Sequence, residues 1–355
     1  MNQSGATTEN QNKLDTLSSS GNNIPLFIQR YLGSLDPGFE IVKIIRDKYP
    51  RLILRANIEE RDCLVKAVRS LTLWKKPGRY FRFQKEIFIY SQLEKLEFRH
   101  FHYPGLTHTD GKRILITDFV ENDPGLPADQ NFYDSAFQAI LELNACGFPC
   151  EKRGGPGWTW EKINRWKFSR STKTLRNLLE GFFIRRKVPL SLFMKILSFW
   201  AGSISSSTKL KKPLLVHRDI FRANIRRPDK SRVYFIDFEK MGLEKRWVFV
   251  DALKIAQAEP LFFEESEEGC AGFPRFHIRL LEGFWEKLVF YRQELGPDKG
   301  AFKLQLRFCL LGWTLKKLVK EKVSSLQRLQ LVGFLERVIL ARGNEFEDWL
   351  EKCPR

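Results

Sequence analysis

Residues 216–224 read VHRDIFRAN, and Asp237 follows thirteen residues later inside the segment VYFIDFE. Short apolar runs, LLV at 214–216 and VYFI at 233–236, lead into the two polar segments and predict strands. Several polar or ionisable side chains therefore come directly after the first strand: His217, Arg218, Asp219 and Asn224. Asp237 comes directly after the second strand.

The part of the chain before these segments predicts mostly strands. Alternating apolar residues and polar turns predict a meander, and Asp110-Gly111 is typical of a hairpin turn. Apolar residues at helical spacing predict one helix before that hairpin. The expected strands are residues 39–46, 51–58, 63–68, 105–108 and 113–119, and the expected helix is residues 81–96.

The remainder of the chain predicts mostly helices, because apolar residues recur at three- and four-residue spacing. The expected helices are residues 131–146, 172–186, 189–207, 275–295, 301–323 and 326–350. The fold class is therefore α+β. We expect residues 1–24 to be a disordered tail because they are polar and carry no apolar targeting segment.

Composition limits the function classes without choosing among them. The chain has 355 residues and a formal net charge of +18, which attracts nucleic acid, an anionic membrane or a phosphorylated substrate, or marks only a basic solvated surface. No apolar run approaches the ~20 residues of a membrane span. The six cysteines lack the spacing of a zinc site, so we expect free thiols in a reducing cytoplasm.

The segments 216–224 and 233–239 resemble motifs of the protein-kinase-like superfamily. His217, Arg218, Asp219 and Asn224 match the catalytic loop H-R-D-x-x-x-x-N, and residues 237–239 (DFE) stand where protein kinases have D-F-G. The resemblance implies a bilobal fold with a small β-rich N-lobe and a larger helical C-lobe. We expect residues 25–122 to form the N-lobe, with a five-stranded antiparallel sheet and one helix, and residues 123–355 to form the C-lobe.

The resemblance also implies roles for individual residues. Asp219, with His217 and Arg218 in the same loop, would accept or orient the proton of the attacking hydroxyl. The metal ligands for Mg²⁺ would be Asn224 and Asp237, with Glu239 as a further oxygen donor. In the N-lobe, Lys66 would bind the ATP phosphates and Glu86 would pair with that lysine.

Two departures from the protein-kinase pattern affect this interpretation. The first turn, residues 46–50 (RDKYP), has no glycine, so its backbone cannot approach phosphates closely. Arg46 or Lys48 contacts the phosphates instead, or the turn is simply solvated. Glu239 replaces the last glycine of D-F-G, and Asp251 either braces the catalytic loop or only caps a helix.

The acceptor is expected to be a small molecule or a sugar. Only thirteen residues lie between Asp237 and Asp251, and the A-P-E motif of a peptide-docking segment is absent from them. The I-D-F-E form is similar to aminoglycoside and choline kinases, while the basic charge favours a glycolipid acceptor, as in lipopolysaccharide-core kinases. Such an enzyme would be cytoplasmic, with peripheral contact to the anionic inner membrane face as one option.

Further alternatives remain open at this point. Trp158, Trp160, Trp166 and Phe168 either stack on sugar rings or belong to the core of the helical lobe. The glycine-free turn also permits a catalytically inactive pseudokinase that only binds nucleotide. No nucleic-acid partner is expected, because no nucleic-acid-binding motif accompanies the charge.

Overall fold

The fold is known from a computed structural model. It describes residues 24–48, 50–69, 77–123, 126, 129–146, 170–206, 214–220, 224–244, 249–255, 300–320 and 324–340. These residues divide into two units, each considered by itself below. The first takes in the described parts of Met1–Glu97, Tyr103–Asn122 and Ile236–Glu239; the second takes in those of Phe98–His102, Asp123–Phe235 and Lys240–Arg355.

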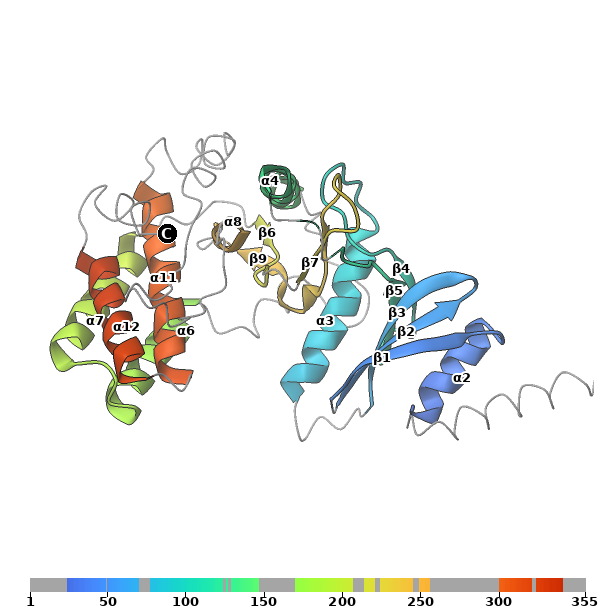
Figure 1. The fold of residues 1–355 in the computed structure, drawn as a ribbon, viewed down its shortest axis with the longest axis horizontal. Helices are drawn as coiled ribbons and strands as arrows, with labels where there is room; N and C mark the ends of the chain where they lie inside the picture. The colour runs from blue at the N-terminus through green and yellow to red at the C-terminus, as the bar shows by residue number, and fades with distance from the viewer. Residues whose placement is uncertain are drawn as a thin grey trace, which may run out of the picture. The chain divides into compact units, whose positions relative to one another are not determined.

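An antiparallel five-stranded sheet with the order β1-β2-β3-β5-β4 forms the centre of the first unit (Figure 1). All five expected strands are present, each within about two residues of its predicted ends. The strands are β1 (Glu40–Lys48), β2 (Arg51–Ile58), β3 (Arg61–Val68), β4 (Leu106–Thr109) and β5 (Ile114–Asp118).

The two faces of this sheet differ because side chains alternate along each strand. Leu54 and Val65 are fully buried on one face, where they pack with Ile28 and Leu32 of helix α2 (Leu26–Leu35). Lys66 therefore points to the other face, where it pairs with helix α3 (Pro77–Leu93). Figure 1 shows α2 and α3 on opposite sides of the sheet.

Helix α2 is the element of this unit that the sequence interpretation did not predict. It follows the polar N-terminal stretch, and its sequence LFIQRYLGSL offers no N-cap side chain, since Pro25 precedes it. Its apolar residues form one face that covers the sheet, because Ile28 and Leu32 lie four residues apart and are both fully buried. The predicted single helix corresponds to α3.

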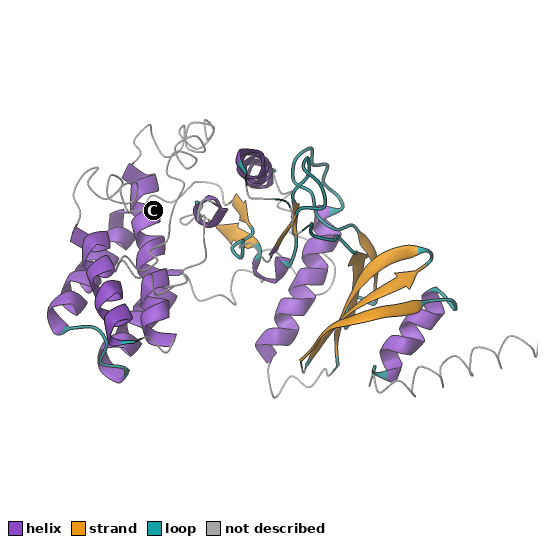
Figure 2. Cartoon of the chain, in the orientation of Figure 1, coloured by secondary structure: helices purple, strands orange, loops and turns teal. Residues whose placement is uncertain are grey.

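Helices make up most of the described part of the second unit (Figure 2). The predicted helix at residues 172–186 ends differently, because α6 passes into a π-helical turn at Glu180–Ile184. Two short antiparallel pairs, β6 with β9 and β7 with β8, carry the segments quoted at the outset. The elements are α4 (Gln130–Ala145), α6 (Arg170–Leu179), α7 (Leu190–Ser206), β6 (Leu214–Val216), β7 (Ile225–Arg226), β8 (Tyr234–Phe235), β9 (Gly242–Glu244), α8 (Val250–Ile255), α11 (Gly300–Lys320) and α12 (Ser325–Leu340).

Some predictions fall outside the described residues: the helix at 275–295, and the roles of Trp158, Trp160, Trp166 and Phe168. Cys63, Cys146 and Cys309 are free thiols. No helix in the described part of the chain is both long and apolar enough to cross a bilayer.

Candidate active site

An ion pair links the sheet to helix α3 in the first unit. Lys66 Nζ of β3 lies 2.6 Å from Glu86 Oε1 of α3, and only 2% of the Glu86 side chain is exposed. Burial lowers the pKa of Lys66, but the carboxylates of Glu86 and Asp237 outweigh it and raise the pKa above its ordinary value. Lys66 is therefore a charged ammonium group in a site with little solvent, which is a suitable anchor for phosphate oxygens.

The segment Ile236–Glu239 belongs to this first unit although it lies far along the chain. Phe238 is fully buried, with its ring centroid 5.0 Å from that of Tyr90 and 6.3 Å from that of Tyr103. Asp237 adopts a left-handed backbone conformation with φ 66°, which costs of order 1–3 kcal/mol in a residue other than glycine. The packing of Phe238 thus holds a strained Asp237 near Lys66.

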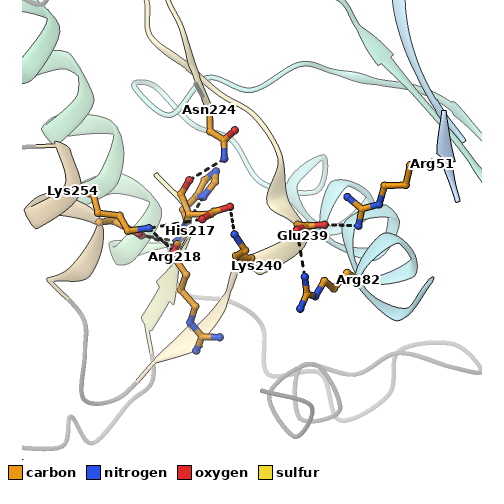
Figure 3. A network of polar contacts seen from close by, with 10 residues as sticks. Arg51, Arg82, His217, Arg218, Asn224, Glu239, Lys240 and Lys254 are labelled. Atoms are coloured by element: carbon orange, nitrogen blue, oxygen red, sulfur yellow. Dashed lines mark hydrogen bonds and ion pairs between the residues drawn. The ribbon is translucent and has the colours of Figure 1, made fainter. Parts of the chain in front are cut away.

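Glu239 pairs with two arginines of the same unit (Figure 3). Its Oε2 lies 2.6 Å from Arg51 Nη2 at the start of β2, and its Oε1 lies 4.0 Å from Arg82 Nη1 on α3. Among the described residues, the buried Nε of Arg51 has no hydrogen-bond acceptor. Burial lowers the pKa of Arg51, but the carboxylates of Glu239, Glu86 and Asp237 outweigh it and raise the pKa. Arg51 therefore has a spare donor in an acidic setting.

The residues of the predicted catalytic loop lie in the second unit, where helix α8 holds their backbone. Asp251 is fully buried, and its carboxylate accepts the backbone N–H of His217 at 2.6 Å and that of Arg218 at 2.8 Å. Lys254, one turn later on α8, donates to the carbonyl oxygen of Arg218 at 2.9 Å. Arg218 has φ 67°, so three hydrogen bonds from one helix stabilise a strained peptide directly before Asp219.

Two lysines flank the carboxylate of Asp219. Lys240 forms an ion pair with its Oδ2, and Lys254 Nζ lies 3.8 Å from its Oδ1. The side-chain amide of Asn224 donates to the backbone carbonyl of Asp219 at 2.9 Å, which leaves the amide oxygen for a cation. Figure 3 shows Asn224, His217, Lys240 and Lys254 converging from separate segments.

The remaining contacts orient the loop. His217 is fully buried, and its Nδ1 accepts the N–H of Asp219 at 3.4 Å. The guanidinium of Arg218 donates to the carbonyl of Leu243 and lies 3.3 Å from a carboxylate oxygen of Glu244, both on β9. The side chains of His217 and Arg218 therefore stabilise the conformation of the loop.

The donor chemistry of Asn224 and Asp237 fits Mg²⁺, which prefers oxygen ligands and takes few from the protein. Among the described residues, no group of three or more His, Cys, Asp or Glu side chains is arranged to hold a metal ion. Glu239 fits less well, because Arg51 already neutralises its carboxylate.

The predicted site residues thus form two groups. Lys66, Glu86, Asp237 and Glu239 gather in the first unit, and His217, Arg218, Asp219 and Asn224 gather in the second. Sequence reasoning left Asp251 open and missed Arg51, Lys240 and Lys254. Little in the sequence identifies these residues, because only their proximity to the motifs along the chain points to them.

Comparison with known proteins gave structural matches only. No protein-family model matches the sequence, and no curated protein matches it either. ADP-bound aminoglycoside phosphotransferase APH(2'')-Ib superposes with a TM-score of 0.54 at 14% identity, covering 89% of this chain and 98% of that one. The streptomycin-ATP complex of APH(2'')-IIa gives 0.53 at 14% identity, covering 85% and 92%.

A third structure, a thermostable APH(4)-Ia mutant in a ternary complex with AMP-PNP and hygromycin B, gives a TM-score of 0.51 at 12% identity, covering 88% and 97%. The chain has the protein-kinase-like fold. The expected fold class is therefore confirmed, and the likeness is to the small-molecule branch of this fold. At these identities the match concerns the fold and leaves the substrate to be argued from the residues.

Proposed function

We propose that the protein is an ATP-dependent phosphotransferase that moves the γ-phosphate to a hydroxyl group of a small molecule or sugar. The observation that carries this proposal is the backbone clamp on the loop 217–219, which holds the strained Arg218 peptide and so presents Asp219. Left-handed residues that the surrounding structure holds in place cluster at functional sites, and here two backbone N–H bonds to one carboxylate hold Arg218 and its neighbour.

In this reaction the acceptor oxygen forms a bond to the γ-phosphorus while the bond from that phosphorus to the β,γ-bridging oxygen breaks. Asp219 takes the proton of the acceptor hydroxyl, and ADP leaves with the bridging oxygen. Lys66 binds phosphate oxygens, and Glu86 orients Lys66. Asn224 and Asp237 would each offer an oxygen ligand to Mg²⁺, which would neutralise charge on the phosphates when bound.

Arg51 supplies a substitute for the missing glycine-rich turn. It lies directly after the turn at 46–50, on the same sheet face as Lys66, since Ile53 pairs with Lys66 and side chains alternate along β2. Its unsatisfied Nε–H needs an acceptor, and a phosphate oxygen would provide one. Glu239, in place of glycine, holds this arginine in position. Arg46 and Lys48 are exposed.

We propose further that the acceptor is anionic, such as a phosphorylated or acidic sugar of a lipopolysaccharide-type glycolipid. Lys240 and Lys254 both lie at the carboxylate of Asp219, so a cation-rich acceptor would meet two ammonium groups there. Lys240 has a 40% exposed side chain, so an incoming anion could reach its ammonium group. An aminoglycoside, which is polycationic, remains the alternative suggested by the fold.

Labelled ATP and Mg²⁺ should be incubated with the protein and with sugars, lipopolysaccharide-core oligosaccharides, aminoglycosides, choline or a generic protein. We expect transfer to one acceptor, reduced about 10²- to 10⁴-fold by Asp219→Asn and lost in Asp237→Ala. Asp229→Asn, in an exposed turn of the second unit, is the control and should leave transfer unchanged. Turnover by Asp219→Asn at the wild-type rate would refute the role of Asp219.

A nucleotide-binding pseudokinase is the second candidate, favoured by the glycine-free turn and by the Arg51–Glu239 pair. It predicts a rise in melting temperature with ATP and Mg²⁺ but no transfer to any acceptor, including water.

A further inference from the structure

The exposed apolar side chains of the second unit are concentrated on a few neighbouring segments. Phe183 and Ile184, in the π-helical turn after α6, are 65% and 73% exposed. Leu190 and Met194 follow, one turn apart on α7, and Leu326 and Leu329 lie near the start of α12. Isolated exposed apolar residues are ordinary, but several on adjoining segments indicate an interaction surface.

Hydrogen bonds join two of these segments, the turn after α6 and the start of α12. Arg328, between the two leucines of α12, donates from Nη2 to the carbonyl of Arg186 at 3.0 Å and from Nε to that of Lys187 at 3.3 Å. The turn after α6 therefore lies against the start of α12, in the helical group labelled α6, α7, α11 and α12 in Figure 1. We call this set the basic apolar surface: Phe183, Ile184, Arg185, Arg186, Leu190, Met194, Lys195, Leu326, Arg328 and Leu329.

The π-helical turn explains why apolar and basic residues are exposed together. The chain leaves α6 at Glu180–Ile184, and Gly181 packs closely on Val188 and Val319, where a Cβ would lie only 3.2 and 3.3 Å from their methyl groups. The next residues then project outward, so that the four consecutive positions 183–186 are all exposed. Phe183 and Ile184 thus present two apolar side chains that could enter an apolar phase, directly beside the cationic Arg185 and Arg186.

Charge indicates what the basic apolar surface binds. Residues 170–206, 300–320 and 324–340 together contain fourteen Lys or Arg side chains and only two acidic ones, Glu180 and Glu336. A nucleic acid would use this charge but not the aliphatic and aromatic side chains, whereas an anionic bilayer uses both. We propose that the basic apolar surface docks the protein on an anionic lipid membrane, with Phe183 and Ile184 entering the interface.

This proposal does not depend on phosphate transfer, so binding is measured directly. The full-length protein is sedimented with phosphatidylcholine vesicles and with vesicles that also contain phosphatidylglycerol. We expect preferential binding to the anionic vesicles, weakened by salt, and at least a tenfold loss of binding in the double variant Phe183→Ser with Ile184→Ser.

The matched control is Val42→Ser with Ile45→Ser, which removes two half-exposed apolar side chains from β1 in the other unit. It should bind vesicles as the wild type does. Circular dichroism and melting temperatures identify any variant that has not folded. The charge reversal Lys195→Glu provides a second test and should weaken binding about fivefold or more.

Three results would overturn the proposal. The first is equal or absent binding of the wild-type protein to both vesicle types, which would assign the surface to a protein partner. The second is equal loss in the β1 control. The third is unchanged vesicle binding in the Phe183 and Ile184 variant together with strong binding to duplex DNA. That result would mean that vesicle binding comes from the positive charge alone.

Discussion

Replacing Asp251 with alanine should loosen the catalytic loop selectively. The fully buried carboxylate accepts two backbone N–H groups, those of His217 and Arg218. Hydrogen bonds to a charged group contribute about 1.5–3 kcal/mol each, and the substitution would leave the buried N–H of His217 and the partly buried N–H of Arg218 without this acceptor. Because water can enter the space vacated by the carboxylate, we expect a loss of about 3–5 kcal/mol in the free energy of opening this region.

The strain at Arg218 adds to this effect. Its left-handed conformation costs of order 1–3 kcal/mol, and without Asp251 the bond from Lys254 and the side-chain contacts of Arg218 to β9 would have to hold it. A displacement of the loop by about 1 Å is enough to reduce a catalysed rate roughly a hundredfold. Amide hydrogen exchange at β6 and α8 measures the opening free energy, and phosphate transfer measures the rate.

Asp129→Ala is a matched control because Asp129, in the same unit, caps α4 with a carboxylate that accepts the N–H of Phe132 at 2.9 Å. Loss of an ordinary N-cap costs about 1 kcal/mol. If Asp251→Ala changes exchange protection no more than Asp129→Ala does, then Asp251 is only a helix cap and the clamp is refuted.

Three further predictions test other parts of the molecule. Arg51→Ala should weaken binding of ATP and ADP about tenfold in calorimetry but leave adenosine unaffected; an equal loss for adenosine would contradict a phosphate contact. Glu86→Gln should destabilise the first unit by about 3 kcal/mol, because it leaves the charge of Lys66 without its nearest partner; unchanged hydrogen exchange in β3 would argue against this. Burial raises the pKa of Glu142, but three backbone N–H donors outweigh it and hold the pKa below its ordinary value. Its contribution to stability is therefore present above the unfolded-state pKa of about 4.3 and is lost as the pH falls through the lower folded-state pKa. Wild type and Glu142→Gln should then differ in melting temperature at neutral pH and converge in acid; a constant difference would contradict this.

The elements that were predicted from sequence are those whose pattern is local. In the strand at residues 51–58 every second residue from Leu52 to Ile58 is apolar, and the structure places β2 at Arg51–Ile58. Helix α2 was missed because its reason for forming is the distant sheet surface that Ile28 and Leu32 cover. The π-helical turn at Glu180–Ile184 was missed because the close packing of Gly181 on Val319 involves residues far apart in sequence.

The same distinction applies to the candidate site. Lys66 and Glu86 were paired in advance through a known motif, and they meet at 2.6 Å. No motif covers Arg51, which meets Glu239 across 188 positions of sequence, or Lys254, whose partner is a backbone carbonyl. Contacts to main-chain atoms leave little trace in side-chain identity, so sequence alone could not reveal them.

The membership of Ile236–Glu239 in the first unit means that the molecule is not modular along its chain. A fragment ending at Asn122 would lack Phe238 and expose the rings of Tyr90 and Tyr103 that it covers. It would also leave Arg51 without its carboxylate partner. Recombination of this chain with a relative therefore has to exchange these four residues together with the N-terminal sheet. A single crossover would combine the sheet of one protein with the segment 236–239 of the other.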